Sequence, residues 1–153
     1  MTEVVRTESE AETSSVAARF AASLSPGTVV LLTGDLGSGK TAFVRGMAEG
    51  LGIDPGEISS PTFTLIQEYR GARVLYHVDL YRLEGAEIED LGLDELSDGG
   101  AVVAIEWAEK LGRPGPGAVR VNIEDRGGDA RDITISGAML TTASTTDNAE
   151  RKT

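Results

Sequence analysis

Residues 34–41 read GDLGSGKT, and this segment constrains what the chain can fold into more than any other. It matches the phosphate-binding loop pattern G-x-x-x-x-G-K-[ST] at every fixed position. The apolar, β-branched run 28–33 before it predicts a buried strand. After it, apolar residues recur four apart at Phe43, Met47 and Leu51, which predicts an amphipathic helix. Glycine-rich backbone before a helix N-terminus can surround an anion with N–H groups, so we expect this loop to bind a nucleotide phosphate.

The side chains of this loop have separate expected tasks. Lys40 carries a charge that can reach the β- and γ-phosphates, and the Thr41 hydroxyl is an oxygen ligand of the kind that Mg2+ takes. GTPases read guanine through an N-K-x-D loop. None of the three lysines here follows an asparagine, so ATP is the expected nucleotide. The loop residues expected to contact it are Gly37, Ser38, Gly39, Lys40, Thr41 and Ala42.

Strand and helix patterns along the chain predict a single α/β domain over residues 1–138. We expect a central, mostly parallel sheet of the P-loop NTPase type, flanked by helices, with antiparallel strands toward the C-terminus. Residues 139–153 are polar and are expected to form a disordered tail. A first helix should start at the capping-box pattern of residues 9–12 and stop at Pro26. Further strands are expected at 63–69, 74–80, 101–106, 119–123 and 133–136, and further helices at 41–51 and 84–91.

Charge and composition limit the partners. The chain has 25 acidic and 14 basic residues, which gives a net charge of −11. Affinity for nucleic acids comes largely from cationic groups that displace counterions, so this chain is a poor candidate for holding RNA or DNA unaided. It contains no cysteine, hence no disulfide and no thiolate zinc site. No apolar run approaches the roughly 20 residues of a membrane span, and no signal-peptide pattern is present, which favours a cytoplasmic protein with no membrane partner.

Two acidic residues are expected beside the phosphate loop because each lies at the end of a predicted strand. Along the strand 74–80, alternate side chains share a face, and Asp79 lies near its C-terminal end. The strand 101–106 is apolar on both faces, as in the centre of a parallel sheet, and ends in Glu106. Ligands of α/β sheets bind at the carboxyl ends of the strands, so both acids should lie at that edge.

Four blocks of sequence together resemble the TsaE family, also called YjeE. They are residues 34–41, SPTFTL at 60–65, YHVDLYRL at 76–83 and IEW at 105–107, in the family's order and approximate spacing. The resemblance covers most of the chain and implies an ATPase required for making threonylcarbamoyladenosine in tRNA. It also implies two partner proteins, TsaB and TsaD, which hold the tRNA and transfer the threonylcarbamoyl group. The tRNA would then be contacted only indirectly.

The resemblance places both acids in the ATP site. We assign Glu106 to Mg2+, directly or through water, and Asp79 to the attacking water or the metal shell, with the two roles exchangeable. Thr62 follows Pro61 in a loop that could sense the γ-phosphate or the metal; the alternative is a turn that starts a strand. Trp107 is expected beside the nucleotide as a lid or partner contact, or else as a core aromatic.

Five further residues are assigned places near the site. Arg131 resembles a family position near the nucleotide, and Glu10 in the first helix is placed near adenine. His77, the one histidine, is expected to make a structural hydrogen bond rather than to transfer protons. Tyr81 and Arg82 are expected to position the nearby acid or, for Arg82, to contact a partner.

The sequence thus predicts an ATP-binding protein that hydrolyses ATP slowly when alone, acting on the TsaB–TsaD complex. Phosphoryl transfer depends mostly on positioning and charge stabilisation, and the sequence shows no obvious arginine finger. Two alternatives stay open. One is a nucleotide-gated binding module, in which ATP orders the loop at Thr62 and Trp107 into a docking surface. The other is a small-molecule kinase, although the long Arg-rich lid of such kinases is absent from the sequence.

Overall fold

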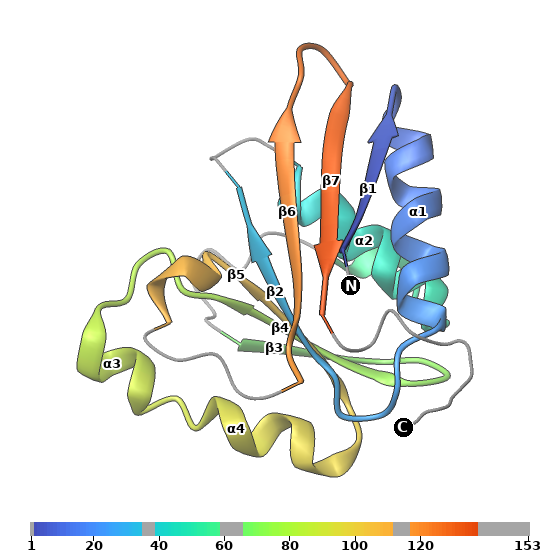
Figure 1. The fold of residues 1–153 in the computed structure, drawn as a ribbon. Helices are drawn as coiled ribbons and strands as arrows, with labels where there is room; N and C mark the ends of the chain where they lie inside the picture. Colours follow the sequence, from blue (N-terminus) through green and yellow to red (C-terminus); the bar gives the residue numbers. More distant parts are fainter. Residues whose placement is uncertain (1, 35–38, 59–65, 112–116, 138–153) are drawn as a thin grey trace.

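The computed structural model describes residues 2–34, 39–58, 66–111 and 117–137, which form a seven-stranded sheet with helices (Figure 1). The strand order is β1-β7-β6-β2-β5-β4-β3. The strands are β1 Thr2–Thr7, β2 Val29–Thr33, β3 Ile66–Arg70, β4 Val74–Asp79, β5 Val102–Glu106, β6 Val119–Asp125 and β7 Arg131–Ser136. The tail predicted for residues 139–153 lies outside the described residues, so it stays a prediction.

The middle of the sheet is parallel and both edges are antiparallel. β6, β2, β5 and β4 run in one direction. β3 pairs antiparallel with β4 at one edge, while β7 and then β1 pair antiparallel beyond β6 at the other. The expected α/β class is confirmed, and so is the antiparallel pair predicted near the C-terminus.

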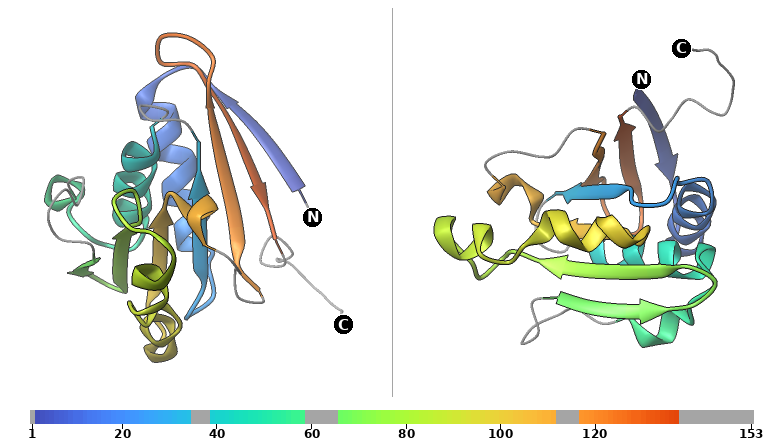
Figure 2. Two further views of the ribbon diagram at one scale, coloured as in Figure 1. Left: turned by 90° about the vertical axis from the view of Figure 1, so that its left-hand side faces the viewer. Right: turned by 90° about the horizontal axis from the view of Figure 1, so that it is seen from below.

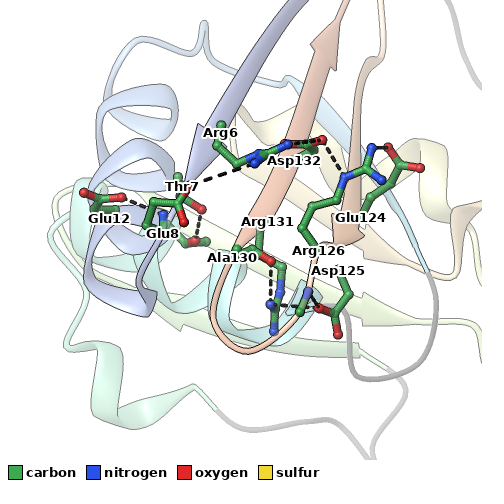
Figure 3. Close-up of polar contacts among 12 residues, drawn as sticks. Arg6, Thr7, Glu8, Glu12, Glu124, Asp125, Arg126, Ala130, Arg131 and Asp132 are labelled. Atoms are coloured by element: carbon green, nitrogen blue, oxygen red, sulfur yellow. Dashed lines mark hydrogen bonds and ion pairs between the residues drawn. The ribbon is translucent and has the colours of Figure 1, made fainter.

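The edge strand β1 is held to β7 by side chains as well as by backbone pairing. Arg6 on β1 forms an ion pair with Asp132 on β7, and Arg126 Nε lies 2.6 Å from the same carboxylate (Figure 3). The hydrogen bonds from Arg6 and Arg126 hold the pKa of the Asp132 carboxyl below its usual range. Strand β1 pairs with a segment more than 120 residues away, and local sequence patterns do not predict a partner at that distance.

Two long helices cover one face of the sheet and two short ones pack on the other (Figures 1 and 2). α1 Glu10–Ala22 and α2 Lys40–Gly50 lie side by side and share a core with the sheet, including the Phe20 and Phe43 rings. On the other face, α3 and α4 contribute Ile88, Leu93 and Leu96 to a second apolar cluster. The short elements are α3 Gly85–Glu89 and α4 Leu93–Leu96, with 3-10 turns at Pro55–Glu57, Ser97–Gly99 and Ala108–Lys110.

The helix boundaries differ in part from those predicted. The Ser9 side chain accepts a hydrogen bond from the Glu12 backbone, as the capping pattern predicts, but α1 ends at Ala22, before Pro26. The helix predicted at 84–91 is shorter in the structure, and α4 was not predicted at all. The many acidic residues between 84 and 98 indicated a solvated surface and concealed the two leucines that anchor α4.

α1 and α2 approach each other closely through two glycines of α2. A Cβ added at Gly46 would lie 2.7 Å from the backbone oxygen of Ser14, and one at Gly50 would lie 2.2 Å from that of Ala18. Both glycines are therefore required by space rather than by backbone conformation. Because α2 begins at Lys40, this contact also sets where the phosphate loop ends.

Three parallel strand ends converge at one edge of the sheet. β2 ends at Thr33, immediately before the phosphate loop, and lies next to β5. Asp79, the last residue of β4, pairs in register with Glu106, the last residue of β5. The expectation that both acids reach the carboxyl edge together is confirmed.

Candidate functional site

The lysine of the phosphate loop opens helix α2. Gly39 is the N-cap residue, and its φ of 107° favours glycine strongly over residues with a side chain. Lys40 follows as the first helical residue, with its side chain buried. The Lys40 ammonium donates to the backbone oxygen of Gly34 and lies 3.9 Å from the centroid of the Trp107 ring. The positive charge is therefore held between the first residue of the loop and the Trp107 ring.

A chain of three side chains links α2 to β5 and β4. The Thr41 hydroxyl lies 3.1 Å from Oε2 and 3.4 Å from Oε1 of the Glu106 carboxylate. His77 Nε2 lies 2.6 Å from the same Oε2. His77 and Glu106 are 0% and 4% exposed. The structural hydrogen bond expected of His77 is present, and its partner is the acid that the sequence analysis assigned to the metal.

Asp79 lies beside this chain and is more exposed. Its Oδ1 accepts a hydrogen bond from the backbone N–H of Tyr81 at 2.9 Å. Burial raises the pKa of Asp79 above its usual value; the Tyr81 hydrogen bond opposes the rise, and the charge of Glu106 adds to it. A raised pKa brings a carboxyl closer to the range in which it can exchange a proton with bound water.

Trp107 follows Glu106 in a backbone conformation that is rare for a residue with a side chain. Its φ is 61°, the one positive value for a non-glycine residue in the described part of the chain. The ring packs on the Tyr81 ring, with centroids 4.9 Å apart, and is partly buried against the apolar cluster beneath α3 and α4. Trp107 packs on the core, as one of its two expected roles predicts, and it also covers Lys40; its role beside the nucleotide stays a prediction. Outliers of this kind gather at functional sites.

A small, open pocket lies beside the N-terminus of α2. It gathers Glu10 and Arg131, which the sequence analysis placed near the nucleotide, with the loop residues Gly39 and Ala42. The Arg131 guanidinium donates to the Gly128 and Ala130 backbone oxygens at 2.8 Å each (Figure 3). Its Nε lies 3.4 Å from the Cβ position of Gly39, so the β6–β7 turn reaches the phosphate loop.

Two pocket residues were missed from the sequence. Thr13 lines the pocket from α1, and its hydroxyl is hydrogen-bonded to that of Thr7 at 2.7 Å. Asp129 lines it from the β6–β7 turn. The sequence signal for Asp129 was weak: it lies two residues before Arg131 in a glycine turn, where an acid is ordinary.

The oxygen donors at the sheet edge suit a hard divalent cation. Mg2+ is bound through one or two protein oxygens together with phosphate oxygens and water. The Thr41 hydroxyl and the Glu106 carboxylate supply such a pair within hydrogen-bond distance of each other. Within the ranges that the structure describes, no group of three or more His, Asp or Glu side chains could hold a metal ion.

Three predicted site residues lie outside the described residues, namely Gly37, Ser38 and Thr62. Their places in the site stay predictions. Of the two residues expected to position Asp79, Tyr81 does so through its backbone N–H, whereas its side chain stacks on Trp107. The Arg82 side chain is exposed.

The fold and the site together define a class of protein. A parallel strand leads through a glycine-rich loop into a helix that begins at Lys40, and the neighbouring strands end in acids beside Thr41. This arrangement is that of a P-loop nucleotide-binding protein. A family model described as "Threonylcarbamoyl adenosine biosynthesis protein TsaE" matches residues 7–133. The chain belongs to the TsaE family, and the resemblance seen in the sequence is confirmed.

Individual relatives agree with this assignment. The tRNA threonylcarbamoyladenosine biosynthesis protein TsaE of Bacillus subtilis (strain 168) is 47% identical over 133 residues, which are 86% of this chain and 83% of that protein. The protein of the same name from Treponema pallidum (strain Nichols) is 44% identical over 115 residues, or 74% and 84% of the two chains. The crystal structure of Bacillus subtilis YdiB matches with a TM-score of 0.73 and 39% identity, covering 90% of this chain and 86% of that one.

Within the described ranges, no helix has both the length and the apolar character needed to cross a membrane.

Proposed function

We propose that this protein binds Mg-ATP on the loop at Lys40 and hydrolyses it slowly, as the ATPase of threonylcarbamoyladenosine synthesis in tRNA, acting on a TsaB–TsaD complex. The observation that carries the proposal is the contact of the Thr41 hydroxyl with the buried Glu106 carboxylate, 3.1 Å apart and next to Lys40. It joins the phosphate loop to the acidic strand end. The family, which acts in threonylcarbamoyladenosine biosynthesis, supplies the setting.

The geometry favours one of the two role assignments that the sequence left exchangeable. Glu106 touches Thr41, so these two oxygen donors would hold Mg2+, which neutralises phosphate charge when bound. Asp79 is more exposed and contacts neither Thr41 nor the imidazole in any hydrogen bond among the described residues. It would orient the attacking water. Lys40 would leave the Gly34 oxygen and pair with the β- and γ-phosphates.

The pocket beside Gly39 would take the nucleoside. Its lining includes the carboxylates of Glu10 and Asp129, which accept hydrogen bonds from amine and hydroxyl groups. The Arg131 guanidinium group can pack on a base or approach the α-phosphate. The pocket opens beside the helix N-terminus, which is where the phosphates of a bound nucleotide would lie.

The contacts of Arg131 support slow hydrolysis by the isolated chain. In P-loop enzymes, a mobile arginine that reaches the transferring phosphate raises the rate strongly. Arg131 is bonded to the turn that carries it, with Asp125 Oδ1 a further 3.3 Å contact. We therefore expect the accelerating charge to come from the partner complex.

The test is ATP hydrolysis with and without purified TsaB–TsaD, with Lys40→Ala as the blank. We expect slow release of phosphate by the protein alone and strong stimulation by the complex, both lost in the variant. A high rate for the isolated protein that the complex leaves unchanged would contradict the proposal. Phosphate appearing on an acceptor rather than in solution would instead establish a kinase.

A second candidate is a nucleotide-gated binding module, and the Trp107 conformation favours it. The Trp107 ring covers Lys40 from a rare backbone conformation, so phosphate binding at Lys40 would disturb that contact. Glu106→Ala separates the candidates. If that variant still binds ATP and the TsaB–TsaD complex but cannot support repeated turnover of tRNA modification, hydrolysis is required. Full turnover by the variant would show that gating suffices.

A further inference from the structure

His77 is the most completely buried ionisable side chain in the described part of the chain, and the proposed reaction gives it no task. It lies on β4 with an exposed fraction of 0%. Its Nε2 atom is 2.6 Å from Glu106 Oε2, while its Nδ1 atom is buried and has no hydrogen-bond partner. One of the two ring nitrogens therefore makes no hydrogen bond.

A purely structural role accounts poorly for an imidazole at this place. Burying a polar atom without a partner is unfavourable, and Nδ1 is such an atom. Two residues earlier, on the same face of β4, the buried side chain is the apolar Leu75, which belongs to the core beneath α1 and α2. An apolar residue would fill the position of His77 equally well, except that it could not bond Glu106.

The direction of the hydrogen bond is fixed by its partner. An ionised carboxylate oxygen only accepts, so His77 Nε2 carries the proton and donates. Oε2 then receives both this donor and the Thr41 hydroxyl, from β4 and from α2. Two donors from different elements on one oxygen prevent the carboxylate from rotating, and they leave Oε1 the less occupied of its two oxygens.

We propose that His77 is a positioning residue. Through its Nε2–H it holds the Glu106 carboxylate in the one orientation that offers an oxygen to the nucleotide-bound cation beside Thr41. This inference rests on the proposed function, since it assigns His77 to the same Mg-ATP site. Donors that orient a metal-ligating group typically matter by roughly 10-fold to 100-fold in metal affinity.

The test compares three substitutions that differ in where a donor is placed. In His77→Gln, the amide nitrogen falls near the place of Nε2, whereas in His77→Asn it falls near Nδ1, and His77→Leu has no donor. The measurement is the ratio of the ATP dissociation constants in EDTA and in Mg2+, by titration calorimetry. We expect all three to bind ATP in EDTA like the wild type. We expect Asn and Leu to lose roughly 10-fold or more of the Mg2+ effect, and Gln to recover most of it.

Wild type and Lys40→Ala are run alongside and report on the proposed function alone. If the wild type binds ATP with a clear Mg2+ effect and all three His77 variants keep it, the positioning role is wrong while the proposed function stands. Equal loss in all three variants would also overturn it, because bulk packing would then explain the effect. If the wild type shows no Mg2+ effect, the site itself is wrong and the inference falls with it.

A second measurement needs no substitution at His77. Because the chain has one histidine, 15N-labelled histidine gives a single imidazole spin system in the NMR spectrum. We expect Nε2 to carry a proton with a shift typical of a strong hydrogen bond, and we expect this resonance to move in Glu106→Gln. An Nε2 without a proton, or a resonance unmoved in that variant, would overturn the proposal even if every His77 variant failed to fold.

Discussion

Asp79 and Glu106 end neighbouring strands, yet their burial and their hydrogen-bond donors differ. Glu106 is buried and has two side-chain donors, whereas Asp79 has a backbone donor and partial exposure. Burial and the nearby charge of Glu106 raise the pKa of Asp79, so its ionised form is disfavoured in the folded protein. The residue best placed to contact water therefore weakens the protein that carries it, as is common at functional sites.

Replacing Asp79 with asparagine should separate stability from activity. A carboxyl whose folded pKa is raised contributes stability below its unfolded pKa of about 3.9 and loses that contribution as the pH rises through the folded pKa. Asp79→Asn keeps an oxygen for the Tyr81 N–H and removes the charge. We expect a higher melting temperature than the wild type at pH 7, and a difference that vanishes below about pH 4.

The same Asp79→Asn protein should not hydrolyse ATP at the partner-stimulated rate. Thermal melts across the pH range and phosphate release with TsaB–TsaD are the two measurements. A variant that is less stable at neutral pH would contradict the burial argument. A variant with full activity would remove Asp79 from the reaction without affecting the stability result.

At the same scale, the sequence was informative where chemistry is encoded locally. The loop motif and the acids at strand ends could be identified because each depends on a few adjacent residues. The bond between His77 and Glu106 could be expected only in kind, since its partner is set by the register of β4 against β5. Thr13 and Asp129 could not be placed because their pocket exists only once distant segments meet.

Among the elements, the contact between α1 and α2 is the one on which the phosphate loop depends. Both helices were predicted from apolar spacing, but the spacing does not show how closely they approach. Gly46 and Gly50 have no space for a Cβ, since backbone atoms of α1 occupy it. The two glycines lower the helix propensity of α2 but allow close packing on α1. This packing fixes the start of α2 at Lys40.

Gly46→Ala tests this contact. In an exposed helix, replacing glycine with alanine stabilises by roughly 0.8–1 kcal/mol. Here the Cβ would lie 2.7 Å from the Ser14 oxygen and from the Ala17 Cβ, and overpacking of this kind costs about 1–3 kcal/mol. We expect net destabilisation in urea unfolding, together with weaker ATP binding because α2 is displaced.

The matched control is Gly99→Ala, where a Cβ would meet nothing within 4 Å. It should leave the unfolding midpoint nearly unchanged. If Gly46→Ala proved as stable as the wild type, the two helices would be able to separate without cost, and the contact would not fix the loop.

For the whole molecule, the acidic balance of the chain is the informative property. A net charge of −11 opposes the approach of another polyanion. The family acts in threonylcarbamoyladenosine biosynthesis, and we expect a chain this acidic to act through other proteins that hold the tRNA. The net charge is known from the sequence alone, whereas the sheet order needed the structure, because β1 joins β7 across most of the chain.

We accordingly expect no measurable binding of tRNA to the purified protein at roughly 150 mM salt, where surface charges are screened beyond about 8 Å. Filter binding with labelled tRNA is the measurement, with TsaB–TsaD as the positive control. The result should not change on adding ATP and Mg2+. Saturable binding to the protein alone would show a cationic surface that the overall charge conceals.

Three separate segments wall the pocket beside Gly39. They contribute Glu10 and Thr13, then Gly39 and Ala42, and finally Asp129 and Arg131. During synthesis on a ribosome, the first two walls emerge long before the third, and the third is useful only after β6 and β7 have paired. A nascent chain would therefore carry its phosphate loop for most of its translation without a complete nucleoside pocket. If the pocket takes a nucleoside as proposed, binding would require the β6–β7 turn to be in place, and a bound ligand would join α1 and α2 to that turn.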